Sequence, residues 1–192
     1  MKLSKKGEYG LRALIDLGMA AEVGPGLLQV AQIAAKEQIP VKFLEQILQS
    51  LREGGIVETQ RGRFGGYRLA KPADRIGMGE VIRRIDGPLA PIGCVSQSAY
   101  EPCSCPDEVH CGLRMLMLDV RNAIAGILDR YTLGDVVEVT LRKMRRDGVV
   151  PDFGPAQPLR RQSSLKKSAR LEPVEGLLHH LFSEPQSEES SS

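Results

Sequence analysis

Residues 39–69 read IPVKFLEQILQSLREGGIVETQRGRFGGYRL and contain two patterns in succession. In the first part apolar residues recur at helical spacing, which predicts a helix from about Val41 to Glu53 that the two following glycines end. Its inward positions are Leu44, Ile47, Leu48 and Leu51. In the second part, residues 56–59 and 67–69 have the composition of short strands, joined by a loop of glycine and arginine. The stretch therefore predicts a helix followed by a β-hairpin.

The residues before this stretch predict two further helices. Ser4 is positioned to cap a helix whose apolar residues repeat up to the breaking sequence Gly24-Pro25-Gly26. A short helix fits residues 30–36, and only the turn at 38–40 separates it from the next helix. Two helices joined by so short a turn form a helix–turn–helix, and the hairpin that follows has the place of a wing. We therefore predict a winged helix-turn-helix domain over residues 1–75.

The charge of this domain favours a polyanionic partner. Residues 1–75 carry 12 Lys and Arg against 8 Asp and Glu, a balance that suits the phosphates of double-stranded DNA. A recognition helix reads base edges in the major groove with side chains near its N-terminus, and a basic wing contacts phosphates. The predicted DNA-binding residues are Lys42, Phe43, Glu45, Gln46, Arg61, Arg63, Gly65, Gly66 and Arg68. The alternative to DNA contact is that the arginines are solvated surface charges and that Glu45 pairs with a residue one helical turn away.

Downstream of the wing the sequence predicts a mostly α-helical second part. A short helix fits residues 78–85, and a loop at 91–110 leads to a long helix with Pro106 as its first residue and Asp107 and Glu108 in its first turn. Its apolar stripe comprises Leu113, Leu116, Met117, Val120, Ile124, Ile127, Leu128 and Tyr131. This stripe exceeds what one small domain needs to dock a helix, which favours a homodimer interface over an intramolecular core. Thr132 is placed to cap a last helix, from Leu133 to about Arg146.

All four cysteines of the chain lie in or beside that loop, at Cys94, Cys103, Cys105 and Cys111. Their grouping indicates a metal centre, an iron–sulfur cluster or a redox switch, because thiols this close in sequence can surround one centre. Four cysteines suit zinc almost as well as an iron–sulfur cluster, and neighbouring thiols can also oxidise reversibly without metal. Enzymatic catalysis is not expected, since no Ser, His and Asp constellation and no phosphate-binding loop is present.

From Gly148 onward the composition changes to prolines, paired basic residues and a Ser and Glu-rich end, which predicts a disordered tail over 148–192. Within it, residues 173–182 fit a short amphipathic helix that carries the pair His179-His180. The basic N-terminus lacks the uninterrupted apolar stretch of a signal peptide, and no run of about 18 apolar residues occurs, so a cytoplasmic protein is expected. The predicted divisions are 1–75 for DNA binding, 76–147 for the cysteine loop and dimerisation helices, and 148–192 for the tail.

Three stretches of the sequence resemble one family: residues 1–14, residues 39–48 and the wing at 61–69. They are similar to the bacterial winged-helix regulators typified by IscR, NsrR and CymR, and the resemblance covers roughly residues 1–146. It implies a homodimer built on the long helix, a palindromic DNA operator and, in the cluster-binding branch, a [2Fe-2S] or [4Fe-4S] centre on three loop cysteines plus a fourth ligand. A regulatory partner of a cysteine-synthesis enzyme complex is the alternative from another class of function.

The cysteine spacing follows the cluster-binding branch only in part. Cys94 keeps the family position just after the short helix, and Cys105 and Cys111 preserve the last interval, so that Cys103 and Cys105 compete for the middle place. The histidine that the resemblance implies three residues after the last cysteine is replaced by Arg114, which cannot bind a metal. Three candidates remain for the fourth ligand, in this order: the additional cysteine, then Glu8, which the resemblance implies is contributed by the partner subunit, and then His110, the neighbour of Cys111. Glu8 could instead form an ion pair with Arg12, one helical turn away.

Overall fold

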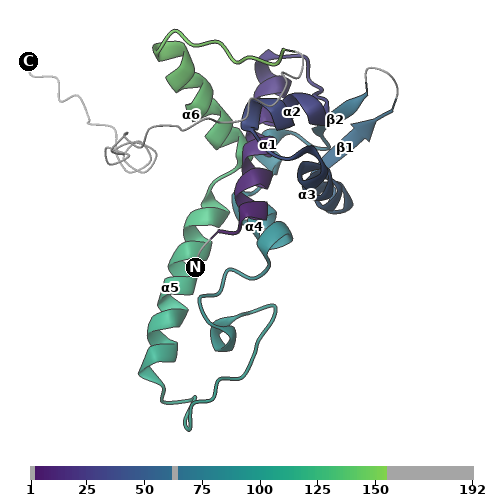
Figure 1. Ribbon diagram of the computed structural model, residues 1–192. Coiled ribbons are helices and arrows are strands. Elements are labelled where there is room, and N and C mark those ends of the chain that lie inside the picture. Colours follow the sequence, from purple (N-terminus) through teal and green to yellow (C-terminus); the bar gives the residue numbers. More distant parts are fainter. Residues whose placement is uncertain (1–2, 62–64, 155–192) are drawn as a thin grey trace, which may run out of the picture. The chain divides into compact units, whose positions relative to one another are not determined.

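The computed structural model describes residues 3–61 and 65–154 (Figure 1). Contacts divide the chain into two units, residues 1–159 and 160–192. The second unit lies outside the described residues, as do the predicted helix at 173–182, its histidine pair and the wing residue Arg63. The proposed division of the chain at residues 75 and 147 stays a prediction. None of the helices within the described ranges is long and apolar enough to cross a membrane.

Helices α2 and α3 form the predicted helix-turn-helix, and α1 packs against both. Helix α1 is Lys5–Val23, α2 is Val30–Glu37 and α3 is Val41–Glu53. The Ser4 hydroxyl accepts a hydrogen bond from the Gly7 N–H at 2.9 Å, which confirms the predicted cap. The turn between α2 and α3 is tight because Gln38 takes the left-handed conformation, with φ of 56°. Fully buried side chains of the three helices form one aliphatic core: Leu14, Leu17, Ile33, Leu44, Ile47, Leu48 and Leu51.

The wing is an antiparallel hairpin of β1, Val57–Gln60, and β2, Gly66–Leu69. Its strands each begin one residue away from the predicted limits, which is within the usual uncertainty of strand ends. Leu28, just before α2, adds a bridge to Tyr67 through backbone hydrogen bonds of 3.0 and 2.8 Å. A β-carbon on Gly66 would collide with the Leu28 carbonyl group. The wing is thus held by the pairing of its two strands and by the bridge to the residue before α2.

Five further elements complete the described fold. The 3-10 helix η1, Ala73–Arg75, precedes α4, Met78–Asp86, and the 3-10 helix η2, Gly93–Val95, lies within the cysteine loop. Helix α5 is Gly112–Arg130 and α6 is Leu133–Arg146, capped by Thr132 as predicted. Helix α5 projects from the rest of this unit: the cysteine loop runs out beside it from α4, and α5 then returns towards α4 and α6 (Figure 1).

The predicted start of the long helix at Pro106 is wrong, because α5 begins six residues later, at Gly112. Asp107 forms a turn of its own: its carboxylate accepts the His110 N–H at 3.1 Å and contacts the His110 ring nitrogen at 2.7 Å. The Cys111 N–H then donates to the Glu108 carbonyl oxygen at 3.4 Å. These local bonds satisfy the backbone in a non-helical form, a known competition between Asp side chains and helix formation. Cys111 itself becomes the residue that caps α5.

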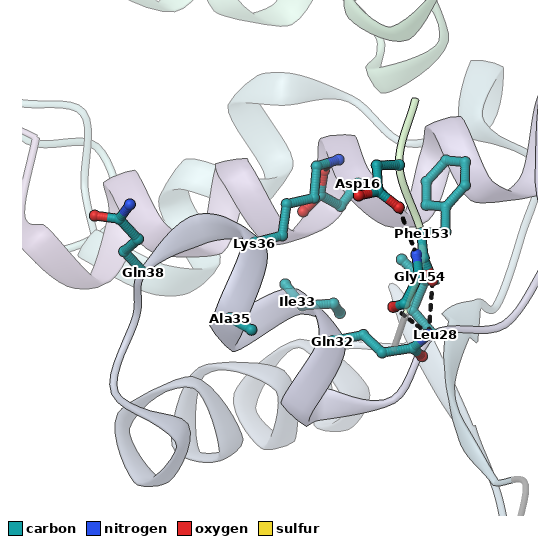
Figure 2. Close-up of a pocket in the computed structure, with 10 residues that line it drawn as sticks. Asp16, Leu28, Gln32, Ile33, Ala35, Lys36, Gln38, Phe153 and Gly154 are labelled. Atoms are coloured by element: carbon teal, nitrogen blue, oxygen red, sulfur yellow. Dashed lines mark hydrogen bonds and ion pairs between the residues drawn. The ribbon is translucent and has the colours of Figure 1, made fainter. Parts of the chain in front are cut away.

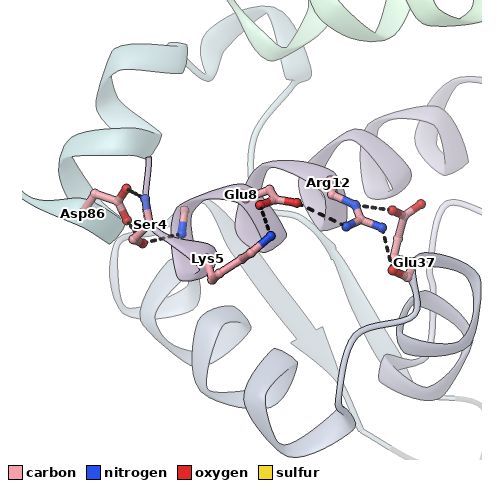
Figure 3. Close-up of polar contacts among 7 residues, drawn as sticks. Ser4, Lys5, Glu8, Arg12, Glu37 and Asp86 are labelled. Carbon is pink, nitrogen blue, oxygen red and sulfur yellow. Dashed lines mark hydrogen bonds and ion pairs between the residues drawn. The ribbon is translucent and has the colours of Figure 1, made fainter. Parts of the chain in front are cut away.

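Helix α1 contacts both α4 and α6 through its glycines. A β-carbon on Gly7 would lie 2.6 Å from the carboxylate of Asp86 in α4, and one on Gly18 would lie 2.5 Å from Val137 in α6. The Ser4 N–H and hydroxyl both donate to the Asp86 carboxylate, at 2.8 and 2.5 Å, beside the ion pairs of α1 (Figure 3). Helix α1 therefore joins the helix-turn-helix to the elements that carry the cysteine loop.

Asp16 is the one charged residue counted among the buried polar residues of the described fold, at 1% exposure. Its carboxylate contacts the Lys36 ammonium at 2.5 Å, and its second oxygen has no hydrogen-bond partner among the described residues. Burial is the main cause that raises the pKa of Asp16 to about 6, and the hydrogen bond from Lys36 opposes it. Above about pH 6 Asp16 is ionised in the folded protein, and this buried charge is less favourable there than the neutral acid.

Asp16→Asn removes this titration and tests it. Because the folded pKa lies above the ordinary value of 3.8, the stabilising contribution of Asp16 is full below about pH 4 and is lost as the pH rises through about 6. The free energy of unfolding of the wild type, minus that of the variant, should fall by roughly 1–3 kcal/mol between these limits. Urea unfolding of both proteins at about pH 4 and 7 measures it; a difference independent of pH would contradict the shift.

Candidate functional site

The first candidate site is the exposed side of α3. Lys42, Glu45 and Gln46 are exposed there and have no hydrogen-bond or ion-pair partner within the described ranges. They follow one another along the first turns of the helix, which is where a recognition helix places its base-reading side chains. Phe43 has a different environment: it is half-buried, and its ring packs edge-on against Tyr9 of α1, with centroids 5.9 Å apart. Phe43 therefore ties the start of α3 to α1.

The wing lies next to α3 (Figure 1). Arg61 is exposed directly after β1, and Gly65 and Gly66 lead into β2. Arg68 is already paired, since its guanidinium contacts Glu58 on the opposite strand at 2.6 Å. Of the described wing arginines, Arg61 is thus the one whose charge is not shared with an acid in the described residues.

The second candidate site is the face of α5. No residue of this helix is buried, although its predicted apolar stripe is present. Leu113 is 58% exposed, Leu116 56% and Ile127 47%. At the end of the stripe only Tyr131, after the helix, is buried. An intramolecular core therefore does not account for the stripe, and a contiguous exposed apolar face of this size is typical of a protein interface.

The third candidate site is the cysteine loop, which brings the four sulfurs to one pocket of about 270 Å³. Cys94 comes from η2 and is 5% exposed, whereas Cys111 caps α5. Cys103 and Cys105 come from the irregular chain between them and are more exposed than Cys94. Residues from the two ends of the loop, Cys94 and Cys111, thus border the same pocket, and their service as ligands stays a prediction.

The thiols perturb one another. A hydrogen bond with Cys103 is the main cause that raises the pKa of Cys105 to about 11. The hydrogen bond from the Cys105 backbone is the main cause that lowers the pKa of Cys103. Burial, followed by the neighbouring Cys103, raises the pKa of Cys94. Of these three thiols, Cys103 is therefore the one that loses its proton most readily. The thiolate is the form of cysteine that binds metals and acts as a nucleophile.

Two arginines of α5 hold the loop, and sequence reasoning did not find this role. The Arg121 guanidinium donates to the Val95 carbonyl oxygen at 2.8 Å, and Arg114 donates to the Cys94 carbonyl oxygen at 3.3 Å. Arg114 also contacts the Glu108 carboxylate at 3.2 Å and lines the cysteine pocket. Arg114 thus occupies the place of the missing histidine with a positive charge beside the sulfurs, which favours anionic ligands there.

The two alternative ligands do not line the cysteine pocket. Glu8 is paired with Lys5 at 2.8 Å and with Arg12 at 3.6 Å, the ion pair that the sequence offered as its other role (Figure 3). The His110 side chain is 82% exposed and contacts Asp107. To bind a metal, Glu8 would have to leave Lys5 and Arg12, and His110 would have to leave Asp107.

An iron–sulfur cluster fits the cysteine pocket by the chemistry of its donors. Four thiols are the commonest complement for such clusters, and all four border one cavity. Within residues 3–61 and 65–154, no three His, Cys, Asp or Glu side chains are already arranged to hold a metal ion. Coordination would therefore draw the loop cysteines closer together. Metal binding commonly orders its own ligands in this way.

A path of direct contacts connects the long helix to the DNA-binding helices. Arg83 of α4 and Asp129 of α5 form a bidentate ion pair, with two contacts of 2.7 Å. Asp86 at the end of the same α4 accepts the two bonds from Ser4. A change in the position of α5 thus reaches α1 through only one intermediate helix.

Known proteins resemble this chain over the same region. A family model described as "Rrf2: Iron-dependent Transcriptional regulator" matches residues 3–139. An Rrf2-like HTH-type transcriptional regulator of Rhodobacter capsulatus is 40% identical over 137 residues, which cover 70% of this chain and 91% of that protein. The HTH-type regulator IscR of Escherichia coli is 33% identical over 137 residues, covering 71% and 80%. The solved structure of CymR, the global cysteine regulator of Bacillus subtilis, superposes with a TM-score of 0.60 at 32% identity, covering 72% of this chain and 98% of that one.

Proposed function

Because the chain belongs to the Rrf2 family of transcriptional regulators, we propose that it is a homodimeric DNA-binding regulator whose operator affinity is set by an iron–sulfur cluster on the cysteine loop. The observation that carries the proposal is that four cysteines line one pocket and that one of them, Cys111, is the N-cap residue of α5. IscR, a relative at 33% identity, belongs to the branch of the family that the cysteine spacing partly follows.

Cys94, Cys103, Cys105 and Cys111 are the proposed ligands, with Glu8 and His110 as alternatives. When bound, the cluster supplies a centre that responds to oxidation, nitric oxide or iron supply. The site also has positive potential: Cys111 lies at the N-terminus of α5, and Arg114 lies in the pocket wall. Both stabilise thiolates and an anionic group.

The proposed signal travels through the contacts of the loop. Arg114 and Arg121 fix the backbone around Cys94 to α5, so a rearranged loop changes the forces on this helix. The Arg83–Asp129 pair then passes a tilt of α5 to α4, and Asp86 passes it to α1 and to the recognition helix that packs on α1. A coupling of about 1–3 kcal/mol between the two sites would change operator occupancy about 5- to 150-fold.

Dimerisation through α5 follows from its exposed apolar stripe. Leu116→Asp places a charge at the centre of this stripe, at a residue that is 56% exposed in the described chain. The variant should fold but dissociate to monomers, because an unpaired charge in an interface is strongly unfavourable. Analytical ultracentrifugation measures the change. Asn122→Asp adds the same charge on the opposite face of α5 and should leave the dimer intact; dissociation of both variants, or of neither, would contradict the assignment.

DNA binding through the wing rests on the exposed Arg61 and on Arg63. Replacing both by Ala should weaken binding to operator and random duplexes by similar factors, because phosphate contacts are independent of sequence. The slope of log K against log salt should become shallower by about one per lost contact. Fluorescence anisotropy over a salt series measures both quantities. Arg142→Ala, on α6 and paired with Glu138, is the matched control, and an unchanged affinity in the wing variant would refute the role of the wing.

The cluster is tested by anaerobic purification with absorption spectroscopy and with analysis of iron and sulfide. The wild type should be coloured and contain both, and Cys94→Ala and Cys111→Ala should lose most of the cluster because these residues border the pocket from its two sides. Comparison of Cys103→Ala with Cys105→Ala identifies whether one or both serve. Ser104→Ala, an exposed change in the same loop, should have no effect. A colourless, iron-free protein with stoichiometric zinc would overturn the proposal.

A metal-free thiol switch is the second candidate, favoured by the direct contact of Cys103 and Cys105. In this case hydrogen peroxide would take two electrons and two protons from the pair, leaving one disulfide and two water molecules. The same purification separates the two functions. Protein without metal whose operator affinity falls on peroxide treatment and returns with a thiol reductant would support the switch.

A further inference from the structure

A second pocket, unrelated to the cysteines, lies between α1, α2 and the chain that follows α6 (Figure 2). Its volume is about 260 Å³, and its polar lining consists of Asp16, Gln32, Lys36, Gln38 and Asp152. Residues 152–154 form one wall, although they belong to the stretch that composition predicted as tail. The volume suits a small metabolite rather than a macromolecule.

The wall is held by specific contacts. The Gln32 side-chain amide donates to the carbonyl oxygens of Phe153 and Gly154, at 2.7 and 3.0 Å (Figure 2). The Phe153 ring lies against Gly24, where an added β-carbon would come within 2.7 Å of the ring. Asp152 accepts the Gly154 N–H at 2.8 Å. The pocket is therefore a built feature, closed by a segment that returns from α6 to the helix-turn-helix.

Asp16, one of the residues that line the pocket, carries a buried acceptor without a donor among the described residues. One oxygen of Asp16 contacts the Lys36 ammonium at 2.5 Å, and the other has no partner among the described residues, although the residue is 1% exposed. A buried carboxylate oxygen left unpaired is costly, and buried polar groups usually have a partner. A ligand with a positively charged N–H donor would complete it.

The wall beside Asp16 carries a cation. The Lys36 side chain is 30% exposed, and its ammonium lies over the Phe153 ring, 5.3 Å from the centroid. With three donors and a single carboxylate oxygen bound, this ammonium keeps N–H groups for an anionic ligand. The pocket thus offers a negative acceptor and a positive donor that are in contact with each other.

We propose that this pocket binds a free α-amino acid, with the ligand's ammonium on the unpaired oxygen of Asp16 and its carboxylate on Lys36. A zwitterion suits the site because its two charges are separated by one carbon atom and match a contacting pair of opposite charges. A cation or an anion bound alone would instead add a net charge to this neutral pair. Since Gln32 and Lys36 belong to α2, an occupied pocket acts directly on the first helix of the helix-turn-helix.

The full chain without DNA is the material for the test, so that the result is independent of the proposed cluster and operator. Thermal unfolding is measured with each of the twenty standard amino acids, and with methylammonium and acetate, singly and mixed, at equal ionic strength. At least one amino acid should raise the midpoint temperature more than the mixture does, because a ligand that binds only the folded chain stabilises it. No such amino acid, or an equal effect of methylammonium or acetate alone, would overturn the proposal.

Variants then locate the site. Asp16→Asn and Lys36→Gln should each lower the affinity for that amino acid, measured by calorimetric titration, by roughly tenfold or more, the usual effect of losing a hydrogen bond to a charged group. Lys71→Gln, which breaks the exposed Lys71–Glu80 pair elsewhere, should bind like the wild type. Circular dichroism checks that each variant is folded. If Asp16→Asn does not fold, Lys36→Gln decides, and full affinity in that variant would refute the site.

Discussion

The close approach of α4 and α6 to α1, at glycines of α1, is the constraint on which the rest of the described structure depends. At Gly7 and Gly18 the space of a β-carbon is already filled by Asp86 and Val137. A larger residue at Gly18 would press on Val137 of α6, and one at Gly7 would displace the Asp86 carboxylate from its bonds with Ser4. Because interiors are close-packed and shift as units, the position of α5 and the orientation of the helix-turn-helix are set by the same contacts.

This arrangement explains how a loop far along the sequence is connected to DNA-binding helices. Each link is a polar contact of an exposed or half-buried group, including Arg121 to the loop, Arg83 to Asp129 and Ser4 to Asp86. Such contacts are individually weak in water. In the proposed mechanism they exchange between two arrangements without disturbing the aliphatic core beneath α3.

The sequence predicted the elements whose signals are local. Helix α3 has its predicted bounds because the apolar positions and the two glycines agree, and the Ser4 and Thr132 caps are residues whose preference depends on neighbouring backbone alone. The start of α5 was missed because the Asp107 turn competes with helix formation. The roles of Arg114 and Asp16 depend on tertiary contacts, with Cys94 twenty residues away and Lys36 on another helix. No periodicity or motif carries that information. The grouping of the cysteines was predicted, whereas the thiol contacts that shift their pKa values were not.

Because Phe153 and Gly154 are hydrogen-bonded to Gln32, tertiary contacts of the described fold continue beyond the last helix. Helix α6 ends at Arg146, and a truncated protein designed from helix limits alone would stop there. It would keep every described helix and strand, yet it would expose the Asp16–Lys36 pair to solvent on the side that residues 152–154 cover. A shortened chain prepared for crystallisation or for NMR should therefore extend at least to Gly154, or its α2 will differ from that of the intact protein.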